Sequence, residues 1–116
     1  MSKFGIYTQI NDLINPHDKY KNFNEIKETA ENNIKEAQYN LAKCYENGEG
    51  TERNLEKAFY WYQKAAENGY TNAQVNLAVL YERGEGTKKN LEMTFYWNRK
   101  AAENGNTTGQ YNLGEH

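Results

Sequence analysis

The chain has 116 residues, carries 14 Lys and Arg against 16 Asp and Glu, and so has a formal net charge of -2 at pH 7. This length favours a single domain with a modest core, and the slightly acidic balance argues against nucleic acid as a partner because no positive field would gather phosphates. Cys44 is the only cysteine, which excludes an intramolecular disulfide and is typical of a reducing compartment, so we expect the protein in the cytoplasm.

Residues 1–17 are predicted to form an N-terminal capping helix or a linker. Ile6, Ile10, Leu13 and Ile14 have the spacing of one face of a short amphipathic helix, which could cover the end of a helical array. The segment lacks the apolar core and cleavage site of a signal peptide, and its polar face lacks the basic cluster of a membrane-surface helix. No other apolar run is long enough to cross a bilayer, so no membrane partner is expected.

The rest of the chain is an internal repeat with a period of 36 residues. Residues 37–72 and 73–108 are identical at 24 of 36 positions when residue i is set beside residue i+36. Residues 18–36 match the second half of this unit faintly, as a degenerate half-repeat with one helix, and residues 109–116 match its beginning, as the truncated start of a further repeat. Self-similarity at a fixed period is typical of an array whose units pack on their neighbours.

Each unit is predicted to contain two helices. Apolar residues recur at helical spacing in two stripes, which in the first unit are Ala37, Leu41, Cys44 and Tyr45, then Leu55, Ala58, Phe59, Tyr62, Ala65 and Ala66. Asn54 and Asn90 precede the second helix as N-caps, and Gly48 and Gly84 end the first in a left-handed conformation. The pattern predicts an all-α fold, an α-solenoid of stacked antiparallel helix pairs.

The remaining glycines are interpreted as turn residues. Gly50 and Gly86 would let the connection inside each unit turn tightly, and Gly69 and Gly105 would follow the end of the second helix. The Gly-Glu-Gly-Thr sequence superficially matches the start of a dinucleotide-binding motif, but its third glycine would fall at Arg53 and a helix, not a strand, precedes it. No nucleotide cofactor is therefore predicted.

The repeated unit closely resembles a known family. The pattern A-x-x-x-L-A-x-x-Y-x-x-G-x-G-T-x-x-N-x-x-x-A-F-x-W-Y-x-K-A-A-x-x-G, from Ala37 to Gly69, resembles the Sel-1-like repeat, a relative of the tetratricopeptide repeat. The resemblance implies an α-solenoid that scaffolds protein complexes, often in signalling or protein quality control. Thr51 stands at a loop position where the family usually has Val. In the second unit Thr94 replaces the alanine seen at Ala58 and Asn98 replaces the aromatic seen at Tyr62, so we expect looser packing there.

Residues able to carry catalysis are few and scattered. His17 lies in a predicted Pro-containing loop, His116 at the C-terminal end, and Ser2 is the only serine, so neither a metal cluster nor a Ser-His-Asp arrangement is predicted. Cys44 occupies the position of Leu80 in the next unit and is interpreted as a small core residue. Trp61 is expected to pack between units and Tyr60 to be exposed. We predict no enzyme activity, no metal and no cofactor.

The predicted function is a protein-interaction scaffold or adaptor that binds other proteins or peptides on the surface formed by the first helices. By resemblance to tetratricopeptide grooves, this surface displays residues that differ between the units: Tyr39, Lys43 and Asn47 in one, and Val75, Val79 and Arg83 in the next. End-to-end self-association is a further expectation, because solenoid units bury their apolar faces only against neighbours.

A second hypothesis remains open from the sequence. Arrays very similar to this one resemble segments attached to kinase-like domains. The chain would then be a regulatory or substrate-docking fragment of a larger enzyme whose catalytic domain lies outside these residues.

Overall fold

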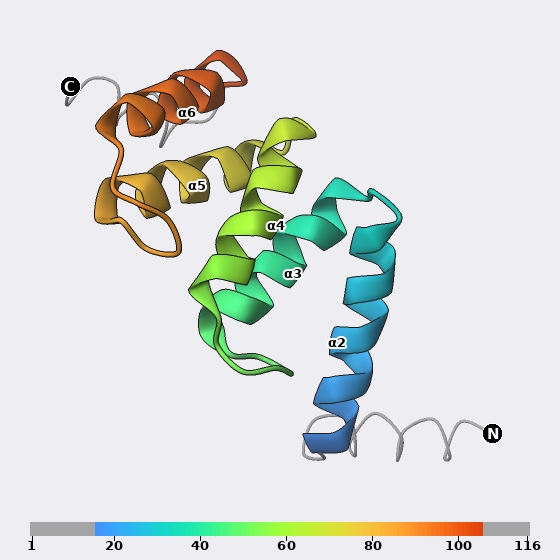
Figure 1. The fold of residues 1–116 in the computed structure, drawn as a ribbon. Coiled ribbons are helices and arrows are strands. Elements are labelled where there is room, and N and C mark those ends of the chain that lie inside the picture. Colours follow the sequence, from blue (N-terminus) through green and yellow to red (C-terminus); the bar gives the residue numbers. More distant parts are fainter. Residues whose placement is uncertain (1–15, 106–116) are drawn as a thin grey trace.

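A computed structural model describes residues 16–105, and within that range the chain forms five helices and no strand. They are α2 (Pro16–Glu31), α3 (Lys35–Asn47), α4 (Leu55–Glu67), α5 (Thr71–Arg83) and α6 (Leu91–Glu103). Each helix packs against the next one in the chain, and Figure 1 shows them following one another from α2 to α6 without closing on themselves. The first helices of the two units start 36 residues apart, as do the second helices, which confirms the all-α solenoid with its predicted period.

Two predicted segments lie outside the described residues, namely most of the N-terminal helix or linker and the truncated repeat at 109–116. The prediction of a loop at His17 is wrong, because α2 begins at Pro16 and places His17 in its first turn. Proline is favoured at the first position of a helix, since its fixed φ suits the helix and its missing N–H would have no intrahelical partner there. Within residues 16–105 no helix is long and apolar enough to span a membrane.

The helix ends are those predicted from the sequence. The side chains of Asn54 and Asn90 each accept a hydrogen bond from the backbone N–H three residues later, at 3.0 and 3.1 Å. Gly48 and Gly84 end α3 and α5 with φ of 71° and 68°, a region that only glycine enters without steric cost.

Small and aliphatic side chains form the core between successive helices. Leu41 and Leu77 are fully buried in the centres of α3 and α5, and alanines such as Ala58 and Ala65 are buried on α4. Alanine lets two helices approach closely, while each leucine fills the space between them. Cys44 departs from the core prediction because it is only partly buried, whereas Leu80 is 2% exposed. The smaller cysteine leaves a hollow of about 140 Å³ beside α2.

Gly86 has a role that the sequence analysis did not predict. Its φ is 74°, as expected for a tight turn. In addition, a β-carbon at this position would overlap the backbone carbonyl oxygen of Leu55, at the start of α4. The loop of the second unit therefore packs directly on the first turn of α4, in the preceding unit, and glycine is required by this contact as well as by the turn.

A buried glutamine joins each unit to the one before it. Gln38 Nε2 donates to the carbonyl oxygen of Ala30 (3.3 Å), and Gln74 Nε2 donates to that of Ala66 (3.1 Å). Both acceptors lie near the end of the preceding helix, where backbone carbonyls lack intrahelical partners. The glutamines are 2% and 4% exposed, so these hydrogen bonds are shielded from water and fix how successive units stack.

Candidate protein-interaction surface

The six residues predicted for partner binding, here called the helix-A strip, lie on α3 and α5. Tyr39, Lys43 and Asn47 are spaced four apart on α3, and Val75, Val79 and Arg83 occupy the equivalent positions on α5. The charged and amide side chains are exposed, while the tyrosine and the two valines are half-buried. The strip therefore combines aliphatic surface on α5 with aromatic and cationic surface on α3.

Tyr39 belongs to a cluster of tyrosine rings and is more than a surface residue. Its ring centroid lies 5.8 Å from that of Tyr62 on α4 and 5.0 Å from that of Tyr70, just before α5. The ammonium of Lys43 lies 5.5 Å from the centroid of the Tyr39 ring, a distance at which cation and ring attract each other. This contact orders Lys43 at the edge of the strip.

A buried hydroxyl lies beneath the strip. Tyr62 is fully buried, and its hydroxyl donates a hydrogen bond of 2.6 Å to the carboxylate of Glu46 on α3. Burial raises the pKa of the Tyr62 phenol far above its ordinary value, the bond to Glu46 raises it further, and a hydrogen bond with Asn76 on α5 acts in the opposite direction. Tyr62 thus links three helices through one polar group.

Two members of the strip are also engaged with loop carboxylates. Arg83 lies 3.7 Å from Glu85 in an exposed ion pair, and Asn47 Nδ2 donates to Glu49 at 3.3 Å. Such exposed pairs contribute little to stability, so both side chains can exchange these contacts for contacts with a partner. The sequence analysis identified the six positions but not these neighbours.

The departures from the repeat pattern in the second unit are buried, which corrects the expectation of looser packing. Thr94 and Asn98 are each 2% exposed. The hydroxyl of Thr94 is within hydrogen-bond distance of the carbonyls of Ala78 (3.2 Å) and Asn90 (3.1 Å). A polar side chain is tolerated in the core when it is hydrogen-bonded, and here the hydroxyl gains a contact across to α5 that alanine lacks.

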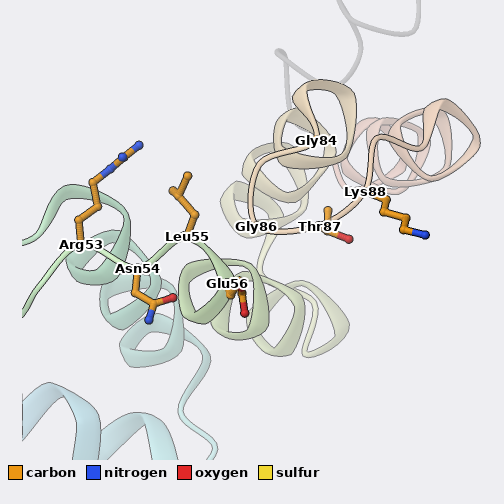
Figure 2. A pocket seen from close by; sticks show the side chains of 8 residues that line it. All are labelled: Arg53, Asn54, Leu55, Glu56, Gly84, Gly86, Thr87 and Lys88. Carbon is orange, nitrogen blue, oxygen red and sulfur yellow. The ribbon is translucent and has the colours of Figure 1, made fainter.

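An open cleft of about 800 Å³ lies where the loops of the two units meet, and it was not predicted from the sequence. Arg53, Asn54, Leu55 and Glu56 line one side, and Gly84, Gly86, Thr87 and Lys88 line the other. Figure 2 shows that Arg53 and Leu55 point one way while Lys88 points away from them. Because these side chains diverge, the cleft does not gather the converging groups of a catalytic site.

The other residues considered for catalysis, metal binding or ring stacking lie in surroundings that do not form a reactive site. Burial raises the pKa of the Cys44 thiol, and the charge of Glu49 raises it further, so the reactive thiolate is disfavoured. Among residues 22–105 no group of three or more His, Cys, Asp or Glu could hold a metal. Tyr60 is 52% exposed, which confirms its expected exposure, and Trp61 is partly buried against the core. Ser2 and His116 lie outside the described residues.

Comparison with known proteins identifies the repeat. The model of the family described as Sel1 repeat matches residues 35–70 and 71–106. No curated protein matches the chain. Among solved structures the chain is similar to c5321, a protective antigen of uropathogenic Escherichia coli strains displaying an SLR fold, with 36% identity and a TM-score of 0.76.

Two further solved structures are similar. A Sel1 repeat protein from Oxalobacter formigenes is 31% identical with a TM-score of 0.80, and the Helicobacter pylori cysteine rich protein B is 25% identical with a TM-score of 0.79. The three matches cover 79%, 84% and 87% of this chain. The chain spans only 20% and 28% of the first two proteins, and 77% of the third.

Proposed function

Because the chain belongs to the Sel1 repeat family, whose repeats are generally protein-interaction modules, we propose that it is a non-catalytic scaffold or adaptor that binds a polypeptide on the helix-A strip. Its role would lie in intracellular signalling or complex assembly, in the cytoplasm. The observation that carries this proposal is a contrast between the two units. Buried positions such as Leu41 and Leu77 are the same, whereas all the strip positions differ and retain solvent-accessible surface.

That contrast has a physical basis. A residue repeated in both units, such as Tyr45 and Tyr81, performs the same packing task twice, because each accepts an edge-on phenylalanine from the preceding helix at 5.5 or 5.2 Å. The strip has no such shared packing requirement. Its aliphatic surface around Val79 and its ordered cation at Lys43 provide the apolar centre and polar edge that are typical of a protein interface.

A second candidate function is a regulatory or substrate-docking part of a larger enzyme, such as a kinase-like protein. The chain spans about a fifth and somewhat over a quarter of two of the proteins it matches, so repeats of this kind occur within longer chains. In this case the strip would bind a substrate or the enzyme's own catalytic domain. The binding surface is the same, and only the identity of the partner changes.

Charge reversal tests the proposed surface. Lys43→Glu with Arg83→Glu is expected to abolish capture of partner proteins in a pull-down, because contacts on the binding surface itself outweigh those of loop side chains that stay hydrated. Arg53→Glu with Lys89→Glu, on the loops, is the matched control and should retain capture. Melting temperatures of both variants are measured in parallel. Equal losses of capture at strip and loops would reject the strip as the binding surface.

A further inference from the structure

A second hollow, separate from the helix-A strip, lies between α2 and α3. Its volume is about 380 Å³, and Ile26, Ile34 and Ala37 give it an apolar floor. Ile34 is 46% exposed, although it is a large aliphatic residue. Glu25 and Glu36 stand at its edge, and the other lining residues are asparagine and threonine. The hollow is therefore apolar inside and acidic at its rim.

The next unit, residues 37–72, shows what fills the equivalent space. Residues 36 positions after Ile26 and Ile34 are Tyr62 and Tyr70. Both of these rings contact the ring of Tyr39 on α3, at centroid distances of 5.8 and 5.0 Å. In that unit the region is thus occupied by aromatic rings, whereas between α2 and α3 two isoleucines leave it open.

We propose that this hollow binds an aromatic side chain of a partner polypeptide, with lysine or arginine beside it in the partner's sequence. An apolar cavity of about 150 Å³ is enough to bind benzene, so an open hollow of 380 Å³ accommodates a phenol or indole. Burial of the ring against Ile26, Ile34 and Ala37 supplies the main attraction.

The charges at the rim specify the rest of the partner. Among residues 22–105 neither Glu25 nor Glu36 has an ion-pair partner, and no cation is among the residues that line the hollow. A partner cation next to the bound ring would meet one of these carboxylates. Within the chain itself a cation also lies beside an aromatic ring, since the ammonium of Lys43 on α3 lies over the Tyr39 ring.

This site is independent of the helix-A strip, so either can fail without the other. It is tested by nuclear magnetic resonance on the isotope-labelled full chain, with acetyl-Lys-Tyr-Lys-amide as the probe. The amide signals of Ile34 and Ala37 are expected to shift on titration. Acetyl-Lys-Ala-Lys-amide should bind at least about tenfold more weakly, because it lacks the buried ring. Acetyl-Glu-Tyr-Glu-amide should bind about threefold more weakly or worse, through like-charge repulsion.

Two variants localise the site. Ile34→Tyr supplies the ring that Tyr70 supplies 36 residues later in the chain, and should remove binding of the probe. If that variant does not fold, Ala37→Leu, which narrows the hollow from α3, takes its place. Glu36→Gln should weaken binding of the probe, whereas Glu92→Gln, at the corresponding first-turn position of α6, should leave it unchanged.

Three results would overturn the proposal. The first is equal binding of the tyrosine and alanine peptides, which would show that no ring is bound. The second is unchanged binding by a folded Ile34→Tyr or Ala37→Leu variant. The third concerns the chain's own N-terminal segment, which contains Phe4 and Tyr7. If Phe4→Ser with Tyr7→Ser tightened probe binding more than about tenfold, that segment and not a partner would be the occupant.

Discussion

At the scale of single residues, glycines with similar backbone conformations meet different requirements. Gly69 has φ of 85° and open space around its α-carbon, so only the backbone conformation demands glycine there. Gly86 has φ of 74° and lies against the backbone of Leu55 as well. The same residue type thus ends a helix in one place and allows two units to touch in another.

Gly86→Ala is expected to destabilise the protein more than Gly69→Ala. Both variants force a β-carbon into a left-handed conformation, at a cost of about 1–2 kcal/mol. Gly86→Ala must also displace its loop from the start of α4, and such overpacking typically adds about 1–3 kcal/mol. Urea unfolding followed by circular dichroism gives the two free energies. Equal losses of unfolding free energy would mean that the loop moves away from Leu55 without destabilising the protein, so that this contact does not require glycine.

Tyr62→Phe is expected to lower the free energy of unfolding by about 1–3 kcal/mol, because the partly buried Glu46 loses its hydrogen-bond donor. Tyr60→Phe is the matched control, since Tyr60 is 52% exposed on the same helix and should change stability little. A loss as small as that of the control would show that water replaces the hydroxyl at Glu46.

The same hydroxyl predicts how stability depends on alkaline pH. The pKa of Tyr62 is raised in the folded chain, whereas an unfolded tyrosine ionises near pH 10. Its contribution is therefore complete below that pH and is lost as the pH rises above it, because the unfolded chain releases the proton first. Tyr45 and Tyr81 have raised pKa values through burial and add to the same trend. Urea unfolding between pH 8 and 11 should show a steeper loss for the natural chain than for Tyr62→Phe, and parallel curves would contradict this.

At the scale of helices, each helix pair depends on the residues that cap its helices and on one fully buried leucine, Leu41 or Leu77. The caps at Asn54 and Asn90 set where α4 and α6 begin, and the left-handed glycines Gly48 and Gly84 set where α3 and α5 end. Gln38 and Gln74 then attach each first helix to the end of the helix before it. Local signals therefore make the helices, and the buried polar contacts set how the pairs stack.

Leu41→Ala or Leu77→Ala is expected to cost about 2–5 kcal/mol, since each leaves a cavity at a fully buried position. Leu91→Ala is a suitable control because Leu91 is 59% exposed on α6. Thermal unfolding monitored by helical circular dichroism measures all three. Losses below 1 kcal/mol at Leu41 and Leu77 would show that neighbouring helices collapse into the vacated space.

At the scale of the whole molecule, the chain is an array in which each helix contacts mainly its sequence neighbours. Stability of such arrays depends on interfaces between successive units. On α4, Leu55 is partly covered because the loop at Gly86 packs on it, whereas the equivalent Leu91 on α6 remains exposed. This apolar surface is the basis for the end-to-end self-association that we propose.

Sedimentation velocity over a range of concentrations is expected to show association that increases with concentration. Leu91→Glu should reduce it, since burying an unpaired carboxylate in an apolar contact is costly. Tyr60→Glu, at a residue exposed on α4 away from that position, should leave the association unchanged. A chain that stays monomeric at every concentration would contradict the prediction.

The two proposed binding surfaces differ in how much of each could be predicted from the sequence. The helix-A strip could be named in advance by its resemblance to tetratricopeptide grooves, at first-helix positions where the two units differ. The hollow between α2 and α3 could not, although one signal was present in the sequence, namely isoleucine at 26 and 34 where the next unit has tyrosine. This difference could be interpreted only once the structure showed that the rings of Tyr62 and Tyr70 both contact the ring of Tyr39. The three tyrosines come from three separate segments of the chain.

The sequence by itself determined the helices, their ends and the 36-residue period, because caps, left-handed glycines and apolar spacing act within a few residues of one another. Tertiary structure decided the overlap between Gly86 and Leu55, the burial of Thr94 and Asn98, and the partial exposure of Cys44. Each of these depends on how closely a neighbouring helix or loop approaches, and that distance results from the packing of all the side chains between them.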